Sequence, residues 1–204
     1  MNLSKTCCIG ILLCLCAAAA SAADPHPALV MVKQTTDQML SRLRADRDKL
    51  KNDPGLVNQL VEEIVLPHFD FKAISASVLG KYWRRADANQ QQRFRDAFKL
   101  LLLRTYATAL VDNMDKKIEF EPVRAAPGAT DVTVRTTIPQ DGEFPIPVNY
   151  SLELIDNQWK VYDVEIDGLS LVANYRNTFA KEINKSGLEG LIKLLEQRNK
   201  ELSS

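Results

Sequence analysis

Cysteine is missing from almost the whole chain. The four cysteines of the 204-residue sequence lie near its beginning, at Cys7, Cys8, Cys14 and Cys16. This segment has one lysine, then an apolar run, then the small residues Ala20-Ser21-Ala22, an order typical of a secretory signal peptide. We therefore expect residues 1–22 to be a signal peptide that is cleaved near Ala22. The mature chain then has no disulfide, no thiolate nucleophile and no cysteine metal ligand.

Two other interpretations of this segment are less favoured. The apolar run is too short to cross a bilayer comfortably. Lipidation of Cys14 or Cys16 is disfavoured because leucine precedes each of them, where a lipidation motif normally has a small residue.

The chain also has no excess of charge of either sign. Its 26 lysines and arginines are matched by 26 aspartates and glutamates. Nucleic-acid-binding surfaces are usually basic, so we expect no nucleic-acid partner. Residues 23–204 suffice for a single domain, with a helical part at about 28–112, a sheet at about 117–167 and C-terminal helices at about 170–200.

Groups that could carry out catalysis are scarce. The sequence has two histidines, His26 and His68, and neither lies in a zinc-binding spacing. No phosphate-binding glycine loop, dinucleotide fingerprint or nucleophile elbow occurs. We expect Ser170 to cap a helix, and we do not expect an enzyme.

One acidic row keeps an enzymatic alternative open. Asp163, Glu165 and Asp167 alternate along a predicted strand, so their carboxylates should share one face. Such a row could serve in acid–base chemistry or bind calcium. It also fits a solvated outer face of a sheet, which is the interpretation that we favour.

Periodicity predicts helices in the first half and at the end of the chain. They are expected over 28–46, 54–66, 71–79, 88–111, 170–184 and 188–200. The helix at 88–111 has a capping box in Asp87 and Gln90 and a wide apolar stripe. Gly80 and Gly187 are expected to stop helices.

Between these helices the pattern changes to period two. Strands are expected near 118–123, 132–138, 146–154 and 159–166, with a tight turn at Asp156-Asn157. Short connections predict an antiparallel sheet of four strands. Helices before and after an antiparallel sheet make an α+β protein.

The long helix, the third strand and the segment WKVYDVEIDGLSLVANYRNTF (159–179) have more bulky apolar residues than one thin sheet needs. Periodicity alone does not distinguish a solid core from a lined cavity.

Several blocks of the sequence resemble the MlaC, or toluene-tolerance, family of periplasmic phospholipid-binding proteins of the Mla pathway. They are LPHFDFKAISASVLGKYWRRADANQQQRFRDAF (66–98), LLLRTYATAL (101–110), VNYSLELIDNQWKVYDVEIDGLSLVANYRNTFAKEI (148–183) and GLEGLIKLLEQ (187–197). The resemblance runs in order from about residue 30 to the end of the chain.

The resemblance implies a curved, NTF2-like sheet, with a helical subdomain that encloses a deep apolar cavity. It implies that the cargo is a glycerophospholipid and that no cofactor is needed. It also implies a shuttle between an outer-membrane lipoprotein–porin complex and an inner-membrane ABC transporter, which maintains outer-membrane lipid asymmetry.

On this basis we expect a lipid-binding cavity made from four segments. The expected lining residues are Phe98, Leu101, Leu102 and Tyr106 of the long helix; Val148, Tyr150 and Leu152 of the third strand; Tyr162, Val164 and Ile166 of the fourth strand; and Leu171, Val172, Tyr175 and Phe179 of the following helix. Each of these also fits an ordinary hydrophobic core.

Three alternatives stay open at this point. The chain could bind another apolar ligand, act as an NTF2-like enzyme through His68 or the acidic row, or serve as an adaptor without a ligand. A docking surface or phosphate contact is expected at basic residues, for which the candidates are Arg84, Arg85, Arg93 and Arg95.

Overall fold

The computed structural model describes residues 24–50, 53 and 55–201, and the expected signal peptide lies outside them. Within the described residues, an antiparallel sheet has five strands in sequential order. They are β1 (Glu119–Phe120), β2 (Asp131–Ile138), β3 (Ile146–Ile155), β4 (Gln158–Ile166) and β5 (Leu169–Ser170). The α+β class is confirmed. The additional strand is β5, a two-residue strand that pairs with the end of β4.

Two tight turns connect the last three strands. Asp156 and Asn157 join β3 to β4 with φ angles of 47° and 62°. Asp167 and Gly168 join β4 to β5 with φ angles of 51° and 77°. Turns with two consecutive positive φ angles match the twist of antiparallel strands, and Asp, Asn and Gly adopt them most readily.

A β-bulge changes the faces of β4. Leu152 of β3 is opposite Val161, whereas the neighbouring Ser151 is opposite Asp163, so Tyr162 is an extra residue. The bulge places Val161 on the same face as Val164 and Ile166. Strict alternation along β4 therefore does not hold.

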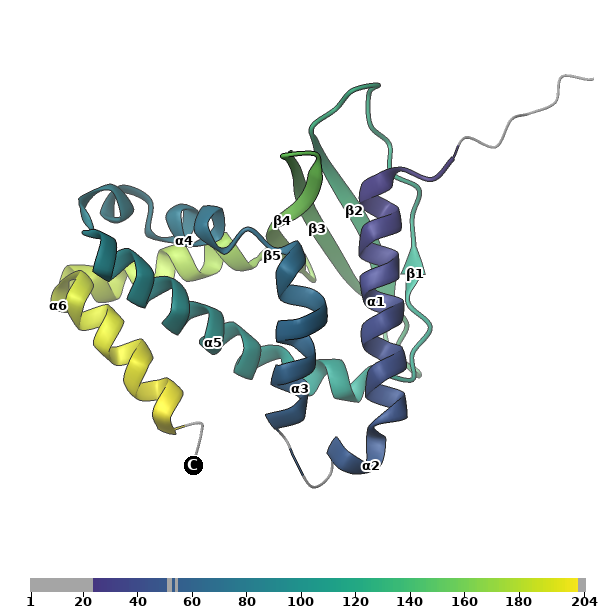
Figure 1. Cartoon of the computed structure of the whole chain (residues 1–204), viewed down its shortest axis with the longest axis horizontal. Coiled ribbons are helices and arrows are strands. Elements are labelled where there is room, and N and C mark those ends of the chain that lie inside the picture. Colours follow the sequence, from purple (N-terminus) through teal and green to yellow (C-terminus); the bar gives the residue numbers. More distant parts are fainter. Residues whose placement is uncertain (1–23, 51–52, 54, 202–204) are drawn as a thin grey trace, which may run out of the picture.

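The first helix packs across the inner face of this sheet (Figure 1). Helix α1 (Pro27–Ala45) begins at His26, whose Nδ1 accepts a hydrogen bond from the Ala28 amide over 3.2 Å. His26 is therefore the N-cap of this helix. A short helix α2 (Arg47–Leu50) follows.

The helix expected at 54–66 is a composite of three conformations. It consists of α3 (Gly55–Leu60), a π-helical turn η1 (Val61–Val65) and a 3₁₀ turn η2 (Leu66–His68). A π-helical turn adds a residue to the helical repeat and changes the direction of the following side chains. Val65, Leu66 and His68 point into the interior described below for this reason.

The middle helices start where their caps predict. Asp70 accepts a hydrogen bond from the Ala73 amide over 2.8 Å and begins α4 (Phe71–Leu79). A 3₁₀ segment, η3 (Gly80–Arg85), leads to α5 (Ala88–Asp112). Asp87 and Gln90 form the expected capping box, with the Gln90 amide 2.8 Å from Asp87 Oδ1.

The last helix, α6 (Leu171–Glu201), contains a break at Gly187, where φ is 72° and ψ is 171°. Figure 1 shows the chain reversing direction there, so that the two halves of α6 flank α4 and α5. The predicted division into two helices at Gly187 is confirmed.

Three clusters of buried side chains hold these elements together. One joins α4, α5 and α6 around Phe94, Phe98 and Phe179. The second joins α1 and the α3–η1 segment to the end of α5 around Leu43 and Leu60. The third packs α1 against β2, β3 and β4. The space where the clusters meet is not filled by side chains.

Candidate ligand-binding cavity

A cavity of about 420 Å³ lies between the sheet, α1, the η1–η2 segment and α5. This is within the range of roughly 300–1,000 Å³ that small-molecule sites usually occupy. Its walls come from segments that are far apart in the sequence, and most of its lining side chains are apolar.

The inner face of the sheet forms the floor of the cavity. The lining residues here are Thr136, Ile138, Ile146, Val148, Tyr150, Val161, Val164 and Ile166. Val148 and Val161 are buried, whereas Ile138, Ile146 and Ile166 are partly exposed. These three isoleucines lie at the sheet end where β2 ends and β3 begins, so the cavity approaches solvent at that end.

Helix α5 forms the wall opposite this end of the sheet. Leu102, Tyr106, Ala109 and Asn113 recur at helical spacing along the cavity. Ala109 is exposed although it lines the cavity, which places the mouth beside it. The amide of Gln140, just after β2, donates to Asn113 Oδ1 over 3.3 Å and joins the two sides of the mouth.

Two walls were not anticipated from the sequence. Helix α1 contributes Met31, Val32, Thr35, Thr36, Met39 and Leu40, and the η1–η2 segment contributes Val61, Val65, Leu66 and His68. The apolar spacing of these segments predicted only that one face is buried. It did not indicate that this face borders a cavity.

The expected lining residues divide into three groups. Leu102, Tyr106, Val148, Tyr150, Val164, Ile166 and Leu171 line the cavity. Phe98 and Val172 instead border a separate void of about 30 Å³, together with Leu102, Val164 and Leu171.

The other expected residues lie elsewhere in the structure. Leu101, Tyr175 and Phe179 belong to the helical cluster around Phe94, and Leu152 is fully buried between α1 and the sheet. The prediction that Tyr162 shares a face with Val164 and Ile166 is wrong because of the bulge. Its hydroxyl donates instead to Asp131 Oδ2 over 2.9 Å, on the other face of the sheet.

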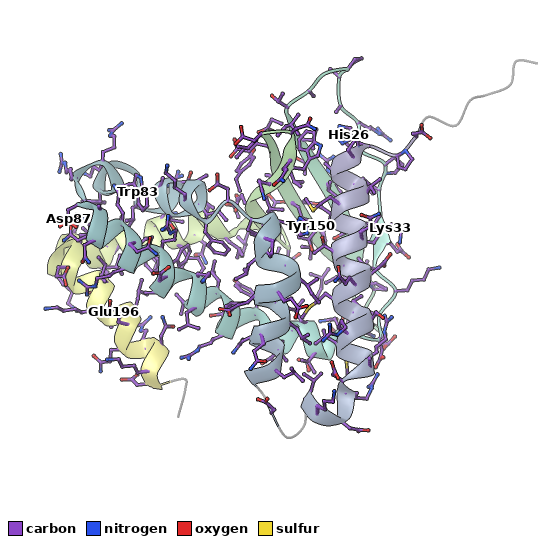
Figure 2. All side chains as sticks on the ribbon, in the orientation of Figure 1. His26, Lys33, Trp83, Asp87, Tyr150 and Glu196 are labelled. Atoms are coloured by element: carbon purple, nitrogen blue, oxygen red, sulfur yellow. The ribbon has the colours of Figure 1, made fainter. Side chains whose placement is uncertain are left out.

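Few polar groups reach the cavity. Burial raises the pKa of the Tyr150 phenol, which lies beside the Thr136 hydroxyl. Thr136 in turn donates to the Val148 carbonyl oxygen over 2.8 Å. Tyr150 is labelled in Figure 2, in the region between the sheet and helices α1 and α3. The pair keeps a neutral phenol on an otherwise apolar floor.

His68 also borders the cavity, and its surroundings disfavour the imidazolium. Burial, and secondarily the charge of Lys160, lower the pKa of His68 below its ordinary value. No acidic side chain lines the cavity within the described residues, so His68 has no carboxylate partner there.

Two carboxylates of the acidic row on β4 accept hydrogen bonds from neighbouring residues of the fold. Asp163 accepts from Ser170 and from the Val172 amide, and Glu165 accepts from Asn149 over 2.8 Å. Asp167 lies in the turn after β4. In the described part of the chain no group of three His, Cys, Asp or Glu side chains has the geometry of a metal site.

The basic candidates for a docking surface differ in their surroundings. Arg84 and Arg85 are exposed. Arg93 forms ion pairs with Glu189 and Glu196, and Arg95 donates to Gln92. Trp83, directly before Arg84, is partly buried and packs against the helical cluster around Phe94.

Among the residues that the structure describes, no helix is both long enough and apolar enough to span a membrane.

An apolar cavity lined by an antiparallel sheet and helices defines a binding protein for an apolar ligand. The sequence matches the MlaC protein family over residues 33–197, and the chain belongs to this family. Members of the family are lipid-binding proteins without enzymatic activity.

Two curated relatives and one solved structure are similar to this chain. The toluene tolerance protein ttg2D of Pseudomonas putida is 30% identical over 168 residues, which cover 82% of this chain and 76% of the relative. The intermembrane phospholipid transport system binding protein MlaC of Haemophilus influenzae is 28% identical over 171 residues, which cover 82% of this chain and 80% of the relative.

The solved structure is the phospholipid-binding protein from Ralstonia solanacearum in complex with a phospholipid. It is 39% identical in sequence, has a TM-score of 0.81, and the match covers 87% of this chain and 99% of that chain.

Proposed function

We propose that this protein is a carrier that binds a phospholipid by its acyl tails and transports it between membranes. The observation that carries the proposal is the apolar cavity of about 420 Å³, which opens beside Ala109 and the end of the sheet. The similar Ralstonia protein was solved with a phospholipid, and the similar Haemophilus protein is a binding protein of a phospholipid transport system.

The energetics of transport explain why such a cavity must be almost purely apolar. Two acyl tails contain about 30 methylenes, and exposing each methylene to water costs about 0.8 kcal/mol, or on the order of 24 kcal/mol in total. A carrier must offset nearly all of this. The isoleucine, leucine and valine side chains of the floor and of α5 supply a suitable surface.

We place the acyl tails against Leu102, Tyr106, Val148, Tyr150, Val164, Ile166 and Leu171. The helix α1 and η1 side chains complete the enclosure. The residues buried in the helical cluster, such as Phe98 and Phe179, support this wall from behind and do not touch the tails.

We further propose that the protein works in the periplasm after cleavage of residues 1–22. It would exchange lipid with an inner-membrane ABC transporter and with an outer-membrane lipoprotein–porin complex of the Mla pathway. The support for these partners is family membership, and the sequence pattern at the start of the chain supports export.

Native mass spectrometry tests the proposal directly. The mature protein is purified from the periplasm without detergent, and the same sample is extracted with solvent for lipid identification. We expect an added mass that corresponds to a diacyl phospholipid. A ligand-free mass that does not change after incubation with phospholipid vesicles would contradict the proposal and favour a ligand-free adaptor.

A further inference from the structure

Lys99 of α5 is an unusual member of the cavity lining. It is the only lysine, arginine, aspartate or glutamate among the lining residues in the part of the chain that the structure describes. It is half-buried. The other residues of α5 that line the cavity are uncharged. The Lys99 ammonium is therefore the one charged group on this wall of the cavity.

The ammonium group of Lys99 has no counter-ion in the described chain. No hydrogen bond or ion pair joins it to any residue that the structure describes. The neighbouring Asp96 is instead hydrogen-bonded to Gln92 over 2.7 Å. Arg93, six residues earlier on α5, differs from Lys99 because it forms ion pairs with two glutamates.

This half-buried ammonium beside apolar side chains has no anion among the described residues to hydrogen-bond. Lys99 is itself partly exposed, so its aliphatic stem can pack on the wall while the charged end reaches solvent at this part of α5, ten residues before Ala109. An anion at that position would form charge-assisted hydrogen bonds with it. The arrangement therefore suits a ligand that joins an apolar tail to an anionic group.

A phenol hydroxyl lies on the same wall of the cavity. Tyr106 follows Lys99 by seven residues, which is nearly two helical turns and places both on one face of α5. Burial, and secondarily the neighbouring Tyr175, raise the pKa of the Tyr106 phenol. Tyr175 stacks edge-on against Phe98, the residue before Lys99, with ring centroids 5.0 Å apart. The Tyr106 phenol remains neutral and can donate to an ester oxygen.

We propose that Lys99 is the head-group site of the cavity and binds the phosphate of the lipid, with Tyr106 beside an ester oxygen. The inference rests on the proposed lipid-carrier function and adds to it a residue that selects the ligand class. The protein would then prefer phospholipids to uncharged lipids that have the same tails.

A loading competition tests this proposal. Delipidated protein is incubated with vesicles that contain equal amounts of phosphatidylglycerol and diacylglycerol with identical acyl chains, and the bound lipids are quantified by mass spectrometry. We expect wild-type protein to be enriched in phosphatidylglycerol about tenfold or more, the usual effect of one charge-assisted hydrogen bond. Lys99→Met should reduce this enrichment to the ratio in the vesicles and should still bind diacylglycerol.

Three further variants make the outcome unambiguous. Lys99→Arg should retain the enrichment, and Lys99→Gln gives a polar, uncharged variant in case the methionine disturbs folding. Lys181→Met is the matched control, because Lys181 is exposed on α6 and does not line the cavity. Unchanged enrichment in folded Lys99→Met and Lys99→Gln would overturn the proposal.

The remaining outcomes separate this inference from the carrier function itself. Failure of wild-type protein to load either lipid would refute lipid carriage. Displacement of bound lipid by millimolar inorganic phosphate alone would show a site for free phosphate and would contradict a lipid head-group site.

Discussion

The hydroxyl of Ser170 donates a hydrogen bond to Asp163 Oδ2 over 2.5 Å. The other oxygen of Asp163 accepts from the Val172 amide over 3.1 Å, and Ser170 Oγ accepts from the Ala173 amide over 3.0 Å. The two side chains together fasten the end of the sheet to the start of α6. A carboxylate that the sequence left open as an acid–base group is thus a structural residue.

This relationship makes Asp163 a stability determinant. We expect Asp163→Ala to destabilise the protein by about 1–3 kcal/mol, because it leaves the Val172 amide and the Ser170 hydroxyl without their acceptor. The measurement is the free energy of unfolding in urea. Asp167→Asn serves as the control, since asparagine tolerates the positive φ of the turn. Equal stabilities of the Asp163→Ala and wild-type proteins would contradict the assignment.

Val148 tests the volume of the cavity. It is buried on the cavity floor, with 7% of its surface exposed. We expect Val148→Trp to fill part of the space and to reduce the lipid-to-protein ratio at least severalfold, with a stability loss of about 1–3 kcal/mol from overpacking.

Lipid extraction and thermal unfolding of the same preparation measure both effects. Thr178→Trp on the exposed side of α6 is a matched control that should load normally. Full loading of a folded Val148→Trp protein would place the lipid elsewhere.

Arg93 links α5 to the second half of α6. It lies 2.8 Å from Glu189 and 2.9 Å from Glu196, at the end of the molecule where Figure 2 labels Glu196 and Asp87. Hydrogen bonds from Arg93 lower the pKa of both glutamates below their ordinary value of 4.5. These ion pairs therefore stabilise the folded protein at a pH above the ordinary glutamate pKa. The stabilisation is lost as the pH falls through the lowered pKa values of the folded state.

We expect Arg93→Met to lower the melting temperature at about pH 7 and to have a progressively smaller effect as the pH is lowered towards about 3, because protonation of Glu189 and Glu196 removes the ion pairs. High salt should also reduce the difference, because these groups are partly exposed. The measurement is thermal unfolding across this pH range. A difference that is constant with pH would show that Arg93 acts only through packing.

Gly187 tests the break in α6. Its φ of 72° and ψ of 171° lie in a region that is essentially restricted to glycine. We expect Gly187→Ala to cost about 1–3 kcal/mol, measured by urea unfolding. Lys185→Ala, two residues earlier on the exposed side, should be nearly neutral. A stable Gly187→Ala protein would mean that the break does not depend on this backbone conformation.

Local chemistry explains why much of the fold could be predicted. Asp70, Asp87 and Gln90 satisfy backbone amides at the starts of α4 and α5, so these helices begin where the sequence indicates. Period-two patterns located β2, β3 and β4, because each has one buried face. The resemblance in four sequence blocks was sufficient to indicate the family.

The cavity itself could be predicted only in part. An apolar stripe on α1 or α5 indicates that a face is removed from water, but a face that touches other side chains has the same pattern as a face that borders empty space. Phe98 and Phe179 therefore looked equivalent to Leu102 and Tyr106, although the first two do not line the cavity.

The sequence by itself determined the class, the caps, most strand positions and the absence of reactive groups, because these depend on residue type and short-range spacing. Only the tertiary structure decided which apolar residues enclose space. The bulge at Tyr162 turns this side chain to the outer face of the sheet. The π-helical turn at Val61–Val65 changes the direction of the side chains that follow it. Lys99 lies among apolar residues that other elements contribute to the cavity lining. These outcomes depend on how distant segments pack, which no local pattern records.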